Sequence, residues 1–140
     1  MRVSLAFALA AMMLTASVGH AWAPWKNNSA VSKKKLDRTY RKARGAYGSA
    51  DYAKAVKYCD EVIKADPKYA PAYALRGKAK KDMGDVDAAN NDLNKAIELD
   101  SKLGEAYYVR GQVHEIMGEM DKAEADYKKA CGAGFREACK

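Results

Sequence analysis

A segment of 26 residues recurs in this chain after an interval of 34 residues. When residues 72–97 are set over residues 106–131, their distinctive positions coincide. The coincident pairs include Tyr73 with Tyr107, Arg76-Gly77 with Arg110-Gly111, Met83-Gly84 with Met117-Gly118, Asp92 with Asp126, and Lys95-Ala96 with Lys129-Ala130. A period of this length is typical of helix–turn–helix arrays, in which each unit buries its apolar face only by stacking on its neighbours. The repeat therefore predicts an all-α solenoid whose curved surface binds another molecule.

The amino-terminal segment has the features of a secretory signal peptide. After a positive start, residues 3–18 carry no charge, and small residues follow at positions that include Ala21 and Ala23. Cleavage after Ala21 is favoured, because cleavage after Ala23 would have to break the bond to Pro24. We therefore expect residues 1–21 to be removed and the protein to be periplasmic or secreted. An N-terminally membrane-anchored form is the alternative, although the apolar run is short for a span of about 20 residues.

Positive charge is concentrated near the start of the expected mature chain. The net charge is +7, and residues 24–49 hold eight basic side chains against Asp37 alone, whereas residues 50–103 hold ten of each sign. The eight are Lys26, Lys33, Lys34, Lys35, Arg38, Arg41, Lys42 and Arg44. The favoured interpretation is a solvated face, and the alternative is docking to an acidic partner or to an anionic membrane. Nucleic acid is not expected as the partner of an exported protein.

Apolar residues at intervals of three and four predict six helices. Residues 22–35 lack this periodicity and are interpreted as a polar and basic linker. The helices are expected near 34–47, 52–65, 70–83, 86–99, 104–117 and 120–132. Gly84 and Gly118 are expected to end helices in the left-handed conformation. The repeats are then 36–69, which is degenerate, 70–103 and 104–137, with 138–140 as the carboxy-terminal end.

The residues at equivalent positions of these repeats carry a family resemblance. The third repeat has Tyr107, Gly111, Gly118, Ala123, Tyr127 and Ala130, and the second has Tyr73, Gly77, Gly84, Ala89, Leu93 and Ala96. The first repeat departs from this pattern with Thr39 in place of the aromatic residue and Ala50 in place of the turn glycine. The pattern resembles the tetratricopeptide repeat family. The resemblance implies a right-handed helix–turn–helix solenoid of three repeats that acts in protein–protein interaction.

In that family the first helix of each repeat lines a concave groove. The resemblance therefore places in the groove Tyr40, Arg44, Tyr47, Lys78, Lys81, Tyr108, Gln112 and Glu115. The three tyrosines have no packing role in the repeat pattern, and tyrosine with arginine is the usual composition of a binding hot spot. The alternative is that these residues are exposed without a partner. We expect capture of a peptide segment, with basic side chains pairing with its acidic groups.

The family's clamp for a terminal carboxylate is not expected here. The clamp needs lysine and asparagine at positions that hold Tyr40, Arg44, Leu75, Glu105 and Val109. Only Arg44 has suitable chemistry among these five, so a receptor for chaperone tails is disfavoured.

The cysteines carry a second, local resemblance. Cys131 and Cys139 lie eight residues apart, as do the paired cysteines of cysteine-rich Sel-like repeat proteins. The resemblance implies a Cys131–Cys139 disulfide, which an oxidising compartment favours. Cys59 falls at a core position of the repeat and is interpreted as a small buried hydrophobe, with an intermolecular disulfide as the alternative.

Catalysis is not expected. The mature chain contains one histidine, His114, and no metal-ligand cluster, Gly-rich phosphate loop or nucleophile with a partner base. We therefore expect neither a metal nor a cofactor. The favoured function is an exported scaffold that binds a protein or peptide partner, and the alternative is a structural subunit of an envelope complex or a self-assembling repeat protein.

Export predicts a processed amino terminus. Amino-terminal sequencing of the protein recovered from its host should begin at Trp22, or at Pro24 if the second site is used. An intact Met1 in a soluble cytoplasmic fraction would contradict the prediction.

Overall fold

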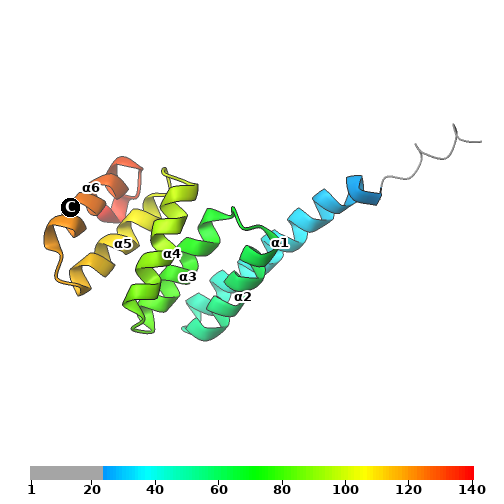
Figure 1. Ribbon diagram of the computed structural model, residues 1–140, viewed down its shortest axis with the longest axis horizontal. Helices are drawn as coiled ribbons and strands as arrows, with labels where there is room; N and C mark the ends of the chain where they lie inside the picture. The colour runs from blue at the N-terminus through cyan, green and yellow to red at the C-terminus, as the bar shows by residue number, and fades with distance from the viewer. Residues whose placement is uncertain (1–23) are drawn as a thin grey trace, which may run out of the picture. The chain divides into compact units, whose positions relative to one another are not determined.

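The computed structural model describes residues 24–140, with side chains described from Ser32 onward, and every regular element in this range is helical (Figure 1). The elements are α1 (Pro24–Gly48), α2 (Tyr52–Ala65), α3 (Ala70–Asp82), α4 (Val86–Leu99), α5 (Gly104–Ile116), α6 (Met120–Gly132) and a final 3-10 turn, η1 (Arg136–Ala138). Residues 34–140 form one compact unit. The predicted signal peptide and its cleavage site lie outside the described residues. None of the described helices is long and apolar enough to span a bilayer.

The helices predicted from apolar periodicity are present, and only the start of α1 differs from its prediction by more than one residue. The helices expected at 52–65, 86–99 and 120–132 have those bounds, and the ends of α3 and α5 differ from the predicted ends by one residue. The prediction of a linker over 22–35 is wrong from residue 24 onward, because α1 begins at Pro24. Proline suits the first turn of a helix, and no further proline or glycine interrupts the chain before Gly45. A solvated helix can form without the apolar stripe that periodicity detects.

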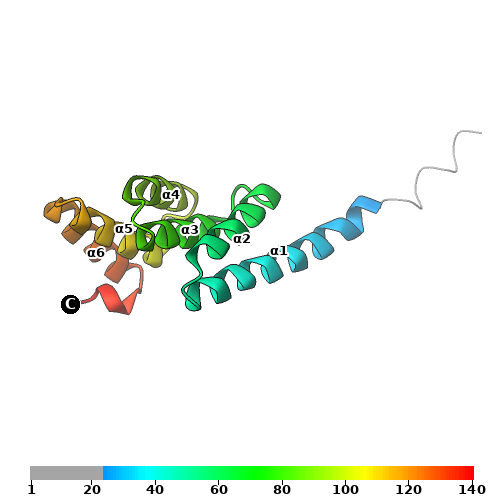
Figure 2. The same ribbon diagram turned by 90° about the horizontal axis from the view of Figure 1, so that it is seen from below.

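Consecutive helices from α2 to α6 pack on one another. Helix α3 packs against α2 and α4, and α5 packs against α4 and α6 (Figure 2). Helices α3 and α5, the first helices of the second and third repeats, also touch. Each repeat therefore buries its apolar face against the next one, as the 34-residue period predicts.

The turns within the repeats use a left-handed residue at the same place. Gly84 and Gly118 have φ angles of +85° and +78°, as predicted. In the first repeat Ala50 occupies the position of these glycines, and its φ angle is +60°. A residue with a Cβ atom adopts this conformation at a cost of roughly 1–2 kcal/mol. The first repeat therefore keeps the turn geometry without the residue that favours it.

Within the second and third repeats, the first helix crosses the second at a glycine. A Cβ atom on Gly77 would lie 2.9 Å from Cγ of Leu93, and one on Gly111 would lie 2.6 Å from Cε1 of Tyr127. No side chain fits at either glycine, because the large residue of the second helix covers it. The glycines predicted to allow close approach do so.

At the same crossing in the first repeat, the two facing residues have different sizes. Ala43 replaces the glycine and faces Cys59, the residue at the position of Leu93, and both are fully buried. A larger residue on the first helix is thus matched by a smaller one on the second. Burial raises the pKa of the Cys59 thiol to about 12. Cys59 is therefore a buried packing residue, as interpreted from its position.

Beside each glycine crossing lies a buried ion pair. Nε and Nη2 of Arg76 donate to the two carboxylate oxygens of Asp92 at 2.8 and 2.6 Å, and Nη1 donates to Asp60 of the preceding repeat at 2.6 Å. Asp92 is only 5% exposed. Burial acts to lower the pKa of Arg76, but the hydrogen bonds from both carboxylates outweigh it and raise that pKa. One arginine thus joins α3 to α4 and to α2.

The third repeat contains the same arrangement 34 residues later. Arg110 donates to both carboxylate oxygens of Asp126 at 2.7 and 2.8 Å, and its third nitrogen donates to Oδ1 of Asn94 in the preceding repeat at 2.8 Å. In the first repeat the equivalent positions hold Lys42 and Tyr58, and the ammonium lies 5.8 Å from the ring centroid. A cation–π contact therefore stands where the later repeats have an ion pair.

The glycine crossing predicts a size-dependent loss of stability. Gly77→Ala should lower the free energy of unfolding by about 1–3 kcal/mol, because the new methyl group overlaps Leu93. Gly45→Ala is the matched control: nothing lies within 4 Å of a Cβ atom there, so stability should be unchanged or raised by up to about 1 kcal/mol.

A second change at Leu93 tests whether overlap with its side chain causes the loss of stability in Gly77→Ala. The double variant Gly77→Ala/Leu93→Cys copies the pair of sizes found in the first repeat and should lose less than the sum of the two single changes in urea unfolding. Additive losses would show that the crossing is not the cause.

The buried ion pair gives a second stability prediction. Asp126→Ala leaves Arg110 partly buried without its bidentate partner and should cost about 3 kcal/mol in chemical unfolding. Glu124→Ala on the same helix removes only an exposed ion pair with Lys128 and should change stability little. Equal effects of the two changes would contradict the assignment.

Candidate functional site

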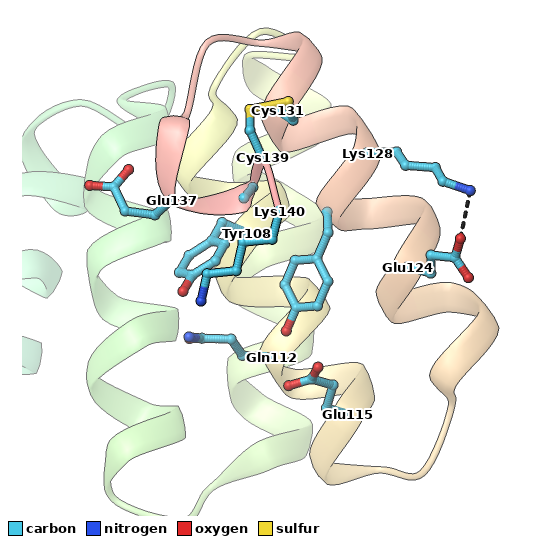
Figure 3. Close-up of a pocket in the computed structure, with 11 residues that line it drawn as sticks. Tyr108, Gln112, Glu115, Glu124, Lys128, Cys131, Glu137, Cys139 and Lys140 are labelled. Atoms are coloured by element: carbon cyan, nitrogen blue, oxygen red, sulfur yellow. Dashed lines mark ion pairs between the residues drawn. A yellow bond between two sulfur atoms is a disulfide. The ribbon is translucent and has the colours of Figure 1, made fainter.

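The residues predicted to line the groove divide between two hollows. The amino-terminal hollow measures about 490 Å³, and its lining is Tyr40, Arg44, Tyr47, Pro71, Leu75, Lys78, Leu103 and Glu105. The carboxy-terminal hollow measures about 530 Å³, and its lining is Tyr108, Gln112, Glu115, Glu124, Tyr127, Lys128, Cys131, Glu137, Ala138, Cys139 and Lys140 (Figure 3). The first hollow holds four predicted residues and the second holds three. Lys81 lines neither.

Polar contacts between α3 and α5 join the two hollows. Nζ of Lys78 pairs with Oε1 of Glu105 at 2.8 Å, and Nζ of Lys81 donates to Oε1 of Gln112 at 3.0 Å. Lys81 also pairs with Asp82 at 3.0 Å. The charges of Lys78 and Lys81 are therefore engaged within the fold. Arg44 is exposed, and it forms no ion pair with any other residue that the structure describes.

Two of the three groove tyrosines, both on α1, make contacts within the fold. The ring of Tyr40 meets that of Tyr69 edge-on with centroids 5.2 Å apart, and its hydroxyl donates to the carbonyl oxygen of Pro71. The hydroxyl of Tyr47 donates to a carboxylate oxygen of Asp82. Burial, and then the hydrogen bond to Asp82, raises the pKa of Tyr47. Both rings therefore have a structural role, which corrects the prediction that they lack one.

Tyr108 also packs, and the sequence pattern could not show its partner. Its ring centroid lies 4.9 Å from that of Phe135 and 5.6 Å from that of Tyr127. The ring also lies against the main buried cluster. Phe135 is equivalent to Ser101 and Pro67 of the earlier repeats, so the aligned positions hold no aromatic residue from which its contact with Tyr108 could be inferred.

Tyrosine and carboxylate side chains meet in the carboxy-terminal hollow. Burial, and then the neighbouring carboxylate of Glu115, raises the pKa of Tyr127. Glu124 is paired with Lys128 at 2.6 Å on the outer side of α6. Figure 3 shows Tyr108 and Gln112 beside the side chain of Lys140, whose ammonium points toward them.

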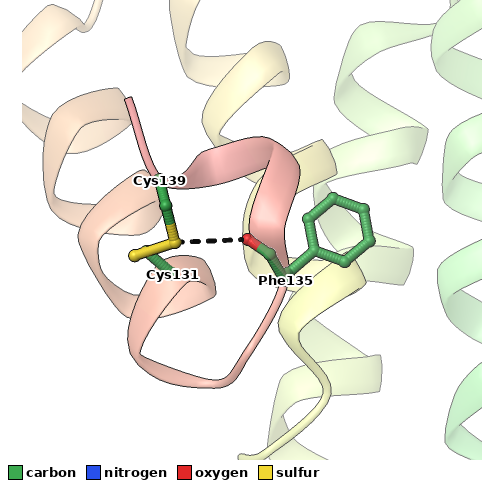
Figure 4. The surroundings of a disulfide bond; sticks show 3 residues. All are labelled: Cys131, Phe135 and Cys139. Carbon is green, nitrogen blue, oxygen red and sulfur yellow. Dashed lines mark hydrogen bonds between the residues drawn. A yellow bond between two sulfur atoms is a disulfide. The ribbon is translucent and has the colours of Figure 1, made fainter.

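The segment after α6 supplies one wall of this hollow, which sequence reasoning missed. The tetratricopeptide resemblance assigned the groove to first helices alone, whereas Cys131, Glu137, Ala138, Cys139 and Lys140 line the hollow from the other side. In the structure a disulfide joins Cys131 to Cys139, whose Cα atoms are 4.9 Å apart (Figure 4). Sγ of Cys139 faces the carbonyl oxygen of Phe135 at 3.8 Å. The link would hold this wall in place.

His114 has structural partners. It is 8% exposed, and its Nδ1 lies 2.6 Å from Glu119 and its Nε2 lies 3.6 Å from Asp126. Glu119 thus binds the ring and Lys122 rather than capping α6 with its side chain. Among residues 24–140, no group of three or more histidine, cysteine, aspartate or glutamate side chains is placed to hold a metal ion.

The comparisons with known proteins agree with this architecture. Residues 74–135 match the family model described as tetratricopeptide repeat. No curated protein sequence matched the chain. The fold is a tetratricopeptide repeat solenoid, all-α as predicted. The resemblance of the Cys131–Cys139 segment to Sel-like repeat proteins stays an expectation.

Solved tetratricopeptide repeat structures have similar folds. The Arabidopsis OM64 domain is 27% identical, with a TM-score of 0.69 over 73% of this chain and 84% of that chain. The TPR2B domain of yeast Sti1, in a complex with Hsp70, is 26% identical, with a TM-score of 0.68 over 71% of this chain and 80% of that one. The first such domain of Spaghetti (RPAP3), bound to an HSP90 peptide, is 19% identical, with a TM-score of 0.68 over 76% and 91%.

The cysteine pair predicts a redox-dependent stability. Cys131→Ser/Cys139→Ser should lower the free energy of unfolding by about 2–3 kcal/mol, because the link closes a short loop of the unfolded chain. Adding reductant to the wild-type protein should produce a similar loss, while the serine variant should not respond.

Peptide mapping of the native protein checks the pairing itself. Without reductant, Cys131 and Cys139 should be recovered linked, and Cys59 should react with an alkylating agent only after unfolding. Two free thiols at positions 131 and 139 would contradict the prediction.

Proposed function

We propose that the chain is an exported scaffold that binds a peptide segment of another protein along the face formed by α1, α3 and α5. The observation that carries this proposal is a pair of hollows to which these helices contribute residues, each lined by tyrosine and charged side chains. Structures with this fold and similar size include complexes with an HSP90 peptide and with Hsp70. Export rests on the sequence of residues 1–21 and is part of the proposal.

The geometry indicates how such a segment would be held. The tyrosine rings are fixed by their contacts with Tyr69, Asp82 and Phe135, so binding would immobilise few additional side chains. A face that is already ordered loses less entropy on binding than a flexible one. Arg44 is the cation of the amino-terminal hollow that is not engaged within the described fold, and it is the proposed contact for an acidic group of the partner.

A second candidate function is assembly with copies of this chain or with an envelope complex. The observation that favours it is an apolar edge, made of large exposed side chains at the turns that follow α3 and α5. Its members are Met83 (54% exposed), Ile116 (59%), Met117 (42%) and Met120 (60%). Sedimentation over a wide concentration range distinguishes this function, because self-association without a ligand would favour assembly over peptide capture.

The peptide-binding proposal is tested by selection from a displayed library of random peptides on the mature protein. Backbone amide shifts in α1, α3 and α5 should change when a selected peptide is titrated, and those of α2 and α4 should change little. If the changes instead cluster on α2 and α4, the groove is not the binding face.

Charge at the amino-terminal hollow gives a further prediction. Arg44→Glu should weaken the binding of acidic selected peptides several-fold and reduce its dependence on salt, because exposed charge pairs are screened within about 10 Å at 0.1 M salt. Lys57→Glu is the matched control, since Lys57 is exposed on α2 and lines neither hollow. Equal weakening by both variants would indicate a long-range charge effect without a contact at Arg44.

A further inference from the structure

We propose that the carboxy-terminal hollow is a subsite for a lysine or arginine side chain of the bound segment. This inference rests on the proposed peptide-binding function and specifies the chemistry of its partner. The expectation from the sequence is a partner recognised through its acidic groups alone. The proposed subsite adds a basic group of the partner, because the unpaired charges of the two hollows have opposite sign.

The first support is the charge of the hollow. Glu115 on α5 and Glu137 on η1 are both exposed, and neither forms an ion pair with another described residue. The remaining carboxylate among these side chains, Glu124, is already paired with Lys128. Two unpaired carboxylates and one unpaired ammonium, that of Lys140, therefore line this hollow, so its unpaired charge is net negative, whereas Arg44 is the unpaired charge of the other.

The second support is the shape of the hollow. Tyr108 and Tyr127 are tilted by 47° to each other with ring centroids 5.6 Å apart, and both line the space. The faces of tyrosine rings attract cations. Glu115 lines the same space, so that a carboxylate and an aromatic wall are presented together. This combination suits a long aliphatic side chain that ends in a cation.

The third support is that a lysine of this chain already reaches into the space. The side chain of Lys140 lies over the hollow and directs its ammonium toward Tyr108 and Gln112 (Figure 3). Lys140 is exposed and has no ion-pair partner among the described residues, so an incoming side chain can displace it. The hollow therefore has the width and polarity to take an ammonium group.

The two hollows together set the direction of the bound segment. Arg44 attracts an acidic group at the α1 end, and Glu115 and Glu137 attract a basic group at the α5–α6 end. The engaged pairs of Lys78 and Lys81 lie between them and add little net charge. A segment with an acidic residue near one end and a basic residue near the other fits this face in one orientation.

The experiment compares peptides selected from one random library by three forms of the mature protein. These are the wild type, Glu115→Gln/Glu137→Gln, and the control Glu61→Gln, whose changed residue is exposed on α2 and lines neither hollow. Lysine or arginine should be enriched at one peptide position with the wild type and the control. The enrichment should disappear with the double variant.

A change in the peptide provides a measurement that does not depend on protein variants. Replacing the enriched lysine by norleucine should weaken binding to the wild type roughly fivefold, through loss of an exposed ion pair and a cation–π contact. The same replacement should weaken binding to Glu115→Gln/Glu137→Gln less, because only the cation–π contact is left to lose. Lys140→Gln should strengthen binding of the lysine peptide, because the competing ammonium is removed.

The outcomes separate this inference from the function on which it rests. If peptides are selected without enrichment of basic residues, or if norleucine weakens binding equally with both proteins, the subsite is overturned and the peptide-binding function stands. If no peptide is selected by any form, the proposed function fails and the subsite fails with it.

Discussion

The structure depends on the close crossing of the two helices within each repeat. At Gly77 and Gly111 a large side chain of the second helix fills the space that a Cβ atom would need, and the adjoining arginines reach a buried aspartate on the second helix. The two features are neighbours in the chain, since each arginine directly precedes its glycine. The glycine sets the distance between the helices, and the bidentate arginine sets their relative rotation.

The same arginines link each repeat to the one before it. Arg76 reaches Asp60, and Arg110 reaches Asn94, in each case on the second helix of the preceding repeat. A repeat array gains its stability from such contacts between neighbours as well as from contacts within a unit. The spacing of the first helices follows from these contacts, and those helices supply part of the lining of both hollows. The geometry of the candidate site is therefore a consequence of the crossing.

The tyrosines of the site have a structural role as well as a proposed binding role. Tyr40, Tyr47 and Tyr108 line the hollows, and each packs on another aromatic ring or donates to a polar group of the fold. Rings held in this way keep their orientation before a ligand arrives. The cost is that truncation of these residues would affect stability and binding together, so the exposed charges are the better probes of function.

The sequence by itself determined the all-α architecture, the bounds of α2, α4 and α6, the left-handed turn glycines and the burial of Cys59. These features are set by local conformational preferences and by a repeated apolar pattern, which are visible along the chain. The tertiary structure alone decided which charges remain available. Lys78 and Lys81 lie on the expected helix, but their partners Glu105 and Gln112 come from the next repeat. Pairing across repeats depends on side-chain directions in three dimensions, which the order of residues does not specify.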